Sequence, residues 1–360
     1  MGDGNSTSKR GGLMAALLLP CALLAPAASG ACAPRPFVGF YDAWDQSDLP
    51  ALPRQLKGLD VFAPRWITIR GAQGQVVVEP DNGAAALAAR EAPRLKLMPL
   101  VSNAHDDVWD QAAADAVILD PGARKVLLAQ LGSLARTKGY GGYIFDLENL
   151  SARARGGYPA LLAAARAALS PSHLQVWASV GAGAEEPLKA VATAADAAVL
   201  MAYDECWATS NAGPIAGADW LRSLLSERLA GVDPQRVVIA LAAYGYDWPD
   251  GKPGRPIGAP QAMALAARMK APLARDGASG NAHFSYLAAG AGHQVWFLDA
   301  RAFAADRAAA AAFRPRGYAL WRLGLEDPAL WNLPRTIAAE RAGGPAPGPA
   351  PHPCNPLKPG

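Results

Sequence analysis

Eight short apolar segments alternate with helix-like segments along this 360-residue chain. Apolar residues recur at helical spacing in the intervening stretches 112–138, 158–169 and 219–229. Strands separated by helices are typical of a parallel α/β fold, and eight of them in order predict a closed (β/α)8 (TIM) barrel over residues 36–338. No glycine-rich phosphate-binding motif follows the first segment, which argues against an open dinucleotide-binding sheet. The eight segments are 37–41, 59–69, 95–101, 143–148, 174–180, 197–204, 236–242 and 317–321.

The connection between the seventh and eighth segments is longer than the others. Over about 249–300 we predict a small insertion on the barrel, with a helix at 261–269 and an extra strand at 294–299. Residues 339–360 are rich in proline and glycine and predict an extended C-terminal tail.

The N-terminal residues have the pattern of a secretory signal. Lys9 and Arg10 precede an apolar run over 13–24, which small residues follow. We therefore predict a signal peptide over 1–31, export to the periplasm or the extracellular space, and no stable membrane span after its removal, because the run is short. Gly2 and Ser6 also match an N-myristoylation pattern. We rank that alternative lower, because basic pair, apolar run and small residues follow in the order of a signal.

Composition excludes some partners and gives no indication of others. A net charge of +3 is too small to suggest nucleic acid or an anionic membrane surface as a partner. The five histidines lack metal-ligand spacing, so we predict no metal and no cofactor. Nothing in the sequence indicates an oligomeric state.

Three cysteines remain after the predicted signal, which contains the fourth. Cys32 and Cys354 bracket the domain, so in an oxidising compartment they could form a disulfide that ties the termini together. The equally weighted alternative is that both lie on loose ends and do not meet. Cys206 would then be a small buried apolar residue rather than a nucleophile, since no histidine lies near it in sequence.

The fourth segment carries two acidic side chains. Alternation places Tyr143, Phe145 and Leu147 on one strand face and Asp146 with Glu148 on the other. Their Cα atoms would be about 6.6 Å apart, given a rise of about 3.3 Å per residue. Like charges in a poorly solvated place raise one pKa, and such pairs occur where an acid and an ionised partner act together. The alternative is a strand end whose carboxylates face water or pair with arginine.

Aromatic and polar residues follow most of the predicted strands, and in a barrel those strand ends meet at one face. Sugar rings stack on tryptophan and tyrosine while their hydroxyls bind carboxylates and amides, so this combination predicts a carbohydrate cleft. For Trp66 and Trp177 we favour core packing. The strand-end residues are Tyr41, Asp42, Trp44, Trp66, Asn103, Asp146, Glu148, Tyr203, Asp204, Tyr244, Trp248 and Trp321.

Four of these segments carry a resemblance to a known family. Residues 142–149, Gly-Tyr-Ile-Phe-Asp-Leu-Glu-Asn, resemble the strand-four signature of glycoside hydrolase family 18, the chitinase-like family, in the short form of its spore-cortex and cell-wall branches. Residues 201–204, 244–248 and 319–324 are similar to its motifs on strands six, seven and eight. Segments 295–300 and 324–328 look like family 18 modules joined to polysaccharide deacetylases and glycosyltransferases.

The resemblance implies a retaining glycosidase that cleaves an N-acetylglucosamine-containing polysaccharide, endo or exo, with help from the substrate's own N-acetyl group. Glu148 would be the general acid, Asp146 would hold the acetamide N–H, and Tyr203 would donate to its carbonyl. The substrate-binding residues would be Tyr41, Trp44, Asn103, Asp204, Tyr244, Trp248 and Trp321.

One departure from the family pattern concerns the acids upstream of Asp146. The fuller motif has two further aspartates where this chain has Gly141 and Ile144, so the proton-shuttling partner of Asp146 is absent and turnover could be slower. A non-catalytic carbohydrate-binding protein of the cell envelope is therefore an alternative. Another is a barrel enzyme acting on uronic polysaccharides, for which the candidate cations Arg65, Arg70 and Arg322 do not cluster in sequence.

Overall fold

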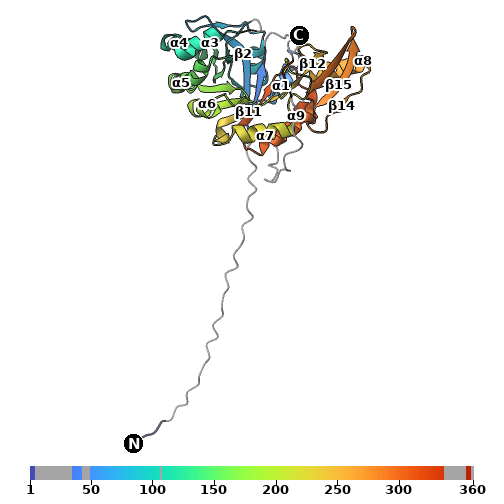
Figure 1. Cartoon of the computed structure of the whole chain (residues 1–360). Helices are drawn as coiled ribbons and strands as arrows, with labels where there is room; N and C mark the ends of the chain where they lie inside the picture. The colour runs from blue at the N-terminus through green and yellow to red at the C-terminus, as the bar shows by residue number, and fades with distance from the viewer. Residues whose placement is uncertain (5–34, 43–48, 106–107, 336–353, 358–360) are drawn as a thin grey trace. The chain divides into compact units, whose positions relative to one another are not determined.

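A computed structural model of the chain describes residues 1–4, 35–42, 49–105, 108–335 and 354–357. Residues 5–31 of the predicted signal peptide, Cys32 and Trp44 lie outside the described residues. The chain from Pro34 onward forms one compact unit (Figure 1). In the described part of the chain, no helix combines the length and the apolar character needed to cross a membrane.

The centre of this unit is a closed ring of eight parallel strands, which confirms the predicted TIM barrel. Neighbours pair in the order β1-β17-β11-β10-β9-β8-β5-β2, and β2 also pairs with β1, so the ring has no free edge. The strands are β1 (Phe37–Tyr41), β2 (Val61–Arg70), β5 (Leu100–Ser102), β8 (Gly142–Asp146), β9 (Gln175–Val180), β10 (Ala197–Met201), β11 (Val237–Ala242) and β17 (Gly317–Trp321).

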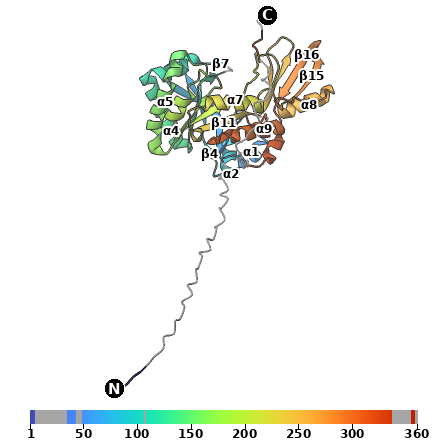
Figure 2. The same ribbon diagram turned by 60° about the horizontal axis from the view of Figure 1, so that its bottom comes forward.

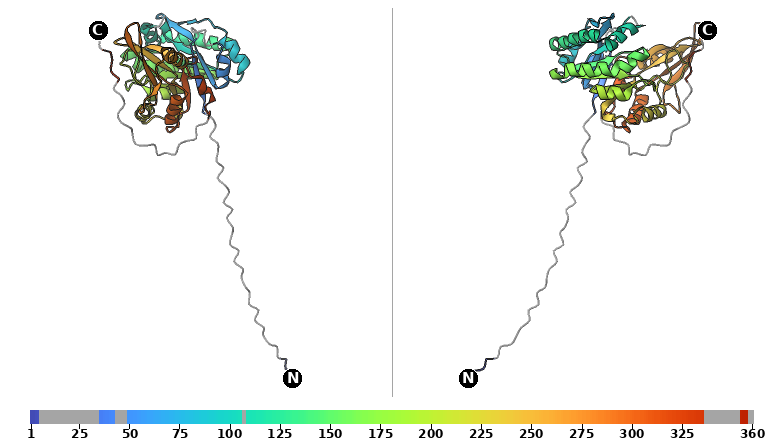
Figure 3. Two further views of the ribbon diagram at one scale, coloured as in Figure 1. Left: turned by 90° about the vertical axis from the view of Figure 1, so that its right-hand side faces the viewer. Right: turned by 60° about the vertical axis from the view of Figure 1, so that its left-hand side comes forward.

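Helices surround the ring, with α3, α4, α5 and α6 along one side (Figures 1 and 3). Several begin at a side chain that caps the free backbone N–H groups; Ser151, for example, accepts a hydrogen bond from Ala154 N (3.2 Å) at the start of α5. The helices are α1 (Leu52–Lys57), α2 (Ala84–Glu91), α3 (Gln111–Leu119), α4 (Pro121–Lys138), α5 (Ala152–Leu169), α6 (Leu188–Ala194), α7 (Ala218–Arg228) and α9 (Ala300–Ala311).

Two shells of apolar side chains hold the barrel together. Outward-facing strand residues such as Phe62, Tyr143 and Phe145 pack against the helices. Inward-facing residues such as Phe40, Ala63 and Ile144 fill the ring. Because strand side chains alternate, the next inward positions carry the five polar residues and the one tryptophan that begin the site. They are Asp42, Arg65, Ser102, Asp146, Ser179 and Trp321.

The insertion between strands seven and eight is a small α/β lobe beside the barrel (Figure 2). It contains an antiparallel sheet in the order β13-β12-β16-β15-β14, covered by α8 (Ala259–Met269). The sheet starts at Tyr244 and has more strands than the single one we predicted. We missed β15, for example, because its exposed face mixes polar residues with Leu287. The strands are β12 (Tyr244–Pro249), β13 (Arg255–Gly258), β14 (Ala274–Arg275), β15 (Ala282–Ala288) and β16 (Ala291–Phe297).

The described disulfide joins Cys206 and Cys354, whose Cα atoms lie 5.2 Å apart. The pairing of Cys354 with Cys32 is therefore wrong. Cys206 is buried among apolar residues as expected, but it forms a disulfide and is not the cysteine left over. Backbone hydrogen bonds also hold the segment around Cys354, from Asn211 N to Asn355 O (2.9 Å) and from Leu357 N to Thr209 O (2.8 Å). Spacing along the chain could not reveal this contact, because the two cysteines are 148 residues apart.

Candidate active site

A cavity of about 600 Å³ opens at the carboxyl ends of the barrel strands. Its floor contains Asp146 at the end of β8, Ser179 on β9 and Met201 at the end of β10. The insertion contributes Tyr246 and Pro256 to one wall. The carboxyl end of the strands is where the loops of a (β/α)8 barrel build their active sites.

Six of the predicted site residues line this cavity together. They are Asp146, Glu148, Tyr203, Asp204, Tyr244 and Trp321. Their side chains come from β8, β10, β12 and β17 or directly follow them, so only closure of the ring brings them to one place.

Three other predicted residues do not line the cavity. Tyr41 is 1% exposed, stacks near Phe62 in the outer core and accepts a hydrogen bond from Asn82 Nδ2 (2.7 Å). Trp248 is 3% exposed and packs beside Tyr246 at the base of the insertion. Asn103 is fully buried beneath the site. Their assignment as substrate-binding residues therefore lacks structural support, because each faces protein rather than the cavity.

Asn103 instead holds the backbone that carries Glu148. Its Oδ1 accepts from Glu148 N (3.0 Å), and its Nδ2 donates to Glu148 O (3.0 Å) and to Asp110 O (3.1 Å). These three hydrogen bonds use both the oxygen and the nitrogen of the Asn103 side-chain amide. Asn103 therefore holds the backbone of Glu148 in position just beyond the end of β8.

Burial and neighbouring carboxylates raise the pKa of Glu148 to about 8. The largest cause is desolvation, followed by the charges of Asp146, Asp204 and Glu186, while Arg65 acts in the opposite direction. Burial also raises the pKa of Asp146, and a hydrogen bond from Ser179 and the charge of Arg65 counter that rise. At neutral pH the raised pKa favours a protonated Glu148, and Ser179 and Arg65 act against the effect of burial on Asp146 beside it.

Asp204, which follows β10, also lines the cavity. It accepts hydrogen bonds from the hydroxyl groups of Tyr244 and Tyr246, the second at 3.3 Å. Burial raises its pKa to about 6, while those two bonds lower it. Tyr203 is adjacent in sequence, and burial with the nearby carboxylates raises its pKa well above the usual value, so its hydroxyl stays protonated and can donate a hydrogen bond.

Sequence analysis missed several aromatic and polar residues of the cavity. Trp109 comes from β7 (Val108–Trp109), which pairs with β6 (Ala104–His105), and Trp207 follows β10 in the loop that the disulfide holds. Ser179 lies on the predicted fifth strand and Tyr246 on β12, which was not predicted as a strand, and neither was assigned to the site. Trp207 lies in a loop and Trp109 on a strand of two residues, so period-two alternation gives no information on the direction of either side chain.

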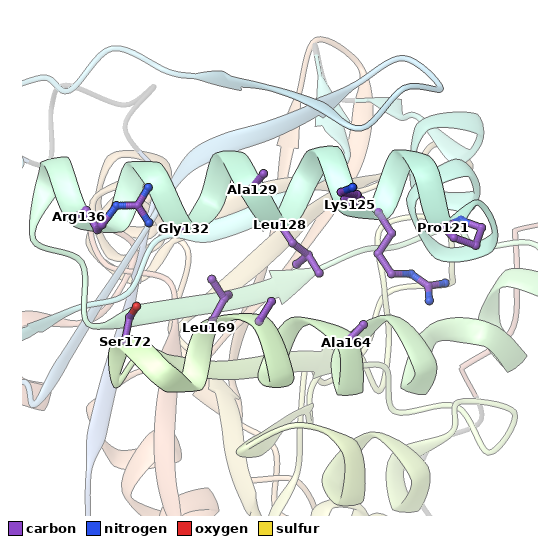
Figure 4. Close-up of a pocket in the computed structure, with 11 residues that line it drawn as sticks. Pro121, Lys125, Leu128, Ala129, Gly132, Arg136, Ala164, Leu169 and Ser172 are labelled. Carbon is purple, nitrogen blue, oxygen red and sulfur yellow. The ribbon is translucent and has the colours of Figure 1, made fainter.

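Another hollow, of about 580 Å³, lies on the outer surface between α4 and α5 (Figure 4). Arg124, Lys125 and Arg136 border it, and small residues such as Gly132 and Ala164 form its base. It contains neither a carboxylate nor an aromatic ring among its lining residues. This hollow follows from poor filling between two helices that face each other with small side chains, and it does not continue the barrel cavity.

Residues 36–326 match the family model of "Glycosyl hydrolases family 18". The chain belongs to this family. As a family 18 member with a cavity of carboxylates and aromatic rings at the end of its barrel, the protein is a glycosidase that takes a carbohydrate substrate.

Relatives with the same fold come from several bacteria. The uncharacterized glycosylase YvbX of Bacillus subtilis is 24% identical over 73% of this chain and 80% of its own length. The cortical fragment-lytic enzyme of the same organism is 25% identical over 68% of this chain and 60% of its own length. A chitinase from Chromobacterium violaceum has a TM-score of 0.75 at 27% identity, covering 83% and 97% of the two chains. The spore cortex-lytic enzyme SleL of Bacillus cereus also has a TM-score of 0.75, at 20% identity over 83% and 73%.

Proposed function

We propose that this family 18 glycosidase cleaves an N-acetylglucosamine-containing polysaccharide with retention of configuration, using the substrate's acetamide as the nucleophile. The observation that carries the proposal is the raised pKa of Glu148, about 8, next to Asp146 in one cavity. Similarity to a chitinase and to cortex-lytic enzymes supports this class of substrate.

Glu148 would protonate the glycosidic oxygen, since it carries a proton at neutral pH and lies at the rim of the strand end. The acetamide carbonyl oxygen would attack the anomeric carbon as the glycosidic bond breaks, giving a cyclic oxazolinium ion. Water, deprotonated by Glu148 in return, would then open that ion and restore the acetamide.

Two side chains would hold the reacting acetamide. Asp146 would accept a hydrogen bond from its N–H and offset the positive charge of the oxazolinium ion, because an ionised group placed where charge develops stabilises the transition state. Tyr203 would donate its hydroxyl hydrogen to the acetamide oxygen. Trp321, which contacts Phe40 edge-on at a centroid distance of 5.5 Å, offers a flat surface under the sugar ring.

The test is Glu148→Gln, which keeps the shape of the side chain and removes its proton donor. We expect kcat to fall by roughly 100- to 10,000-fold while the affinity for N-acetylated oligosaccharides, measured by calorimetry, stays close to that of the wild type. Glu186→Gln is the matched control, because Glu186 acts on Glu148 through its charge and does not line the cavity. It should retain most of the activity.

Substrate assistance has a second requirement, which separates it from the alternatives. Only N-acetylated oligosaccharides should be cleaved, and de-N-acetylated ones should resist, because they lack the internal nucleophile. Equal cleavage of both would argue against the mechanism, and binding without any cleavage would favour a carbohydrate-binding protein.

We also propose that the protein acts outside the cytoplasm. The basic pair and apolar run of residues 9–24 support export, and the disulfide between Cys206 and Cys354 suits an oxidising compartment. Fractionation of cells followed by determination of the mature N-terminus tests this proposal. A mature protein that still carries residues 1–31 would contradict it.

A further inference from the structure

Arg65 occupies an unusual place for a cation, at an inward position of the barrel. It follows Ala63 on the inner face of β2 and its side chain is 12% exposed. Immediately after it the register between β2 and β5 shifts, between Arg65 and Ile67. Such an irregularity re-aims side chains at the rim of a barrel, and here it occurs next to Arg65, on the strand that is separated from β8 by β5 alone.

Asp42 fixes the guanidinium group of Arg65. One Asp42 oxygen lies 2.5 Å from Arg65 Nη2, and the Asp42 side chain is 10% exposed. Asp42 follows β1, which pairs with β2 in the ring, so the pair spans two adjacent strands. A charge-assisted hydrogen bond with this little exposure holds the planar group in one orientation.

The surroundings of Asp146 are apolar below and polar at the sides. Ile144, two residues earlier on the same strand face, belongs to the apolar filling of the ring. Ser179 on the neighbouring β9 donates a hydrogen bond to Asp146, and the positive charge of Arg65 acts on both Asp146 and Glu148. The small Ser102 is the register partner of Asp146 on β5, the strand between β8 and β2. A small residue there leaves the space above β5 to the longer arginine side chain.

We propose that Arg65, oriented by Asp42, is a positioning residue that keeps Asp146 ionised beside a protonated Glu148. This inference rests on the proposed function, because it assigns Arg65 a role through those two acids. The positive charge of Arg65 then compensates the negative charge of Asp146 from across β5. The position two residues earlier on β8, Ile144, can therefore remain apolar. An ionised Asp146 is what the acetamide N–H and the oxazolinium ion require.

The other charged and titratable groups around the pair are mostly acidic. They are Asp42 paired with Arg65, Arg322 after β17 in the cavity lining, Asp204 and Tyr203 after β10, Glu186 with its ion-pair partner Arg155, Tyr244 and Tyr246 on β12, and Tyr158 on α5. Asp204 and Glu186 raise the pKa of Glu148, as Asp146 does. Arg155 is paired with Glu186 (3.3 Å), as Arg65 is with Asp42, but Arg65 is the cation whose charge lowers the pKa of both Asp146 and Glu148.

The test compares the pH profiles of kcat/KM for wild type and Arg65→Met. Loss of the charge should displace both limbs to higher pH by roughly one unit, because Asp146 and Glu148 both hold their protons more tightly. On the acid limb this displacement corresponds to an approximately tenfold loss of kcat/KM. Arg65→Lys keeps the charge and should leave both limbs in place.

Arg275→Met is the matched control, since Arg275 also pairs with an aspartate, Asp299, but in the insertion. Its profile should superimpose on that of the wild type. If the pH profile of kcat/KM for Arg65→Met coincides with that of the wild type, this inference is overturned. The proposed function would still stand if Glu148→Gln is inactive. If Arg65→Met does not fold, a displaced Arg65→Lys profile would equally overturn it. A wild-type protein that cleaves nothing would remove the proposed function and this inference together.

Discussion

At position 148, one carboxyl group has to serve catalysis at the expense of stability. Its side chain is close to Asp146 and Asp204 in a cavity where water is limited, and these conditions raise its pKa to about 8. A proton on Glu148 at neutral pH is useful for protonating a leaving group. The same shift means that ionising Glu148 in the folded protein costs free energy.

The stability of the protein should therefore depend on pH through Glu148. The pKa of Glu148 in the folded protein, about 8, exceeds the ordinary value of 4.5. The contribution of Glu148 to the free energy of unfolding is therefore fully present below pH 4.5 and is lost as the pH rises towards 8. Glu148→Gln cannot ionise and escapes this loss. We expect the free energy of unfolding of Glu148→Gln to exceed that of the wild type by an amount that grows from pH 5 to pH 8.

Urea unfolding at several pH values measures this difference. Glu227→Gln, at an exposed position on α7, controls for the removal of a negative charge. A difference between Glu148→Gln and wild type that is constant across pH, or that shrinks, would contradict the raised pKa of Glu148.

At the scale of elements, strand β8 determines where Asp146 stands. It begins at Gly142, which has φ +149°, a conformation that L side chains rarely adopt. A Cβ atom there would lie 2.7 Å from the backbone nitrogen of Gln175, the register partner of Gly142 on β9. The glycine thus permits the close pairing of β8 and β9, which places Asp146 near Ser179.

Gly142→Ala should consequently lower the free energy of unfolding by about 1–3 kcal/mol, because the added methyl group overlaps backbone that cannot move aside. Denaturant unfolding provides the measurement. Gly156→Ala is the matched control inside α5, where a Cβ atom would meet nothing within 4 Å. That change should stabilise the protein by about 0.5–1 kcal/mol, since alanine favours the helix. Equal effects of the two substitutions would refute the argument from close pairing.

At the scale of the whole molecule, a covalent link connects the C-terminal segment to the loop after β10. That loop carries Trp207 on the cavity wall, one residue after Cys206. Ser210 also forms an isolated bridge with Pro356. The end of the chain therefore contributes to the shape of the carbohydrate cavity although it lies far from it in sequence.

Cys354→Ser should lower the free energy of unfolding by about 2–4 kcal/mol, because the disulfide restricts a long loop in the unfolded chain. The pairing itself can be checked by proteolysis without reductant followed by mass spectrometry, which should yield a fragment linking the peptides of Cys206 and Cys354. A fragment that links Cys32 to Cys354 would contradict the structure, and wild-type protein treated with reductant serves as the control.

Much of the barrel could be predicted because its signals are local. Segments 37–41 and 317–321 agree with β1 and β17 to the residue, since a buried parallel strand is a short apolar run bounded by polar or flexible residues. The third strand was harder, because Pro99 separates β4 (Lys96–Leu97) from β5. The strands of the insertion were mostly missed, since a half-exposed strand such as β15 mixes polar and apolar residues.

For the site, sequence reasoning found the acids and the strand-end rings but not their directions. Asp146, Glu148, Tyr203 and Asp204 are recognisable because charged and hydroxyl groups directly follow buried strands. Tyr41 has the same pattern and yet faces the helices, because alternation along β1 puts it on the outer side.

The sequence by itself determined the period of the strands and helices, the presence of two acids two residues apart, and the family to which the chain belongs, since each depends on neighbouring residues. Only the tertiary structure decided which side chains share the cavity, that Cys206 joins Cys354, and that Arg65 pairs with Asp42. These contacts depend on closure of the ring and on the register of its strands. Such long-range geometry is set by the packing of the whole barrel, and no short stretch of sequence contains it.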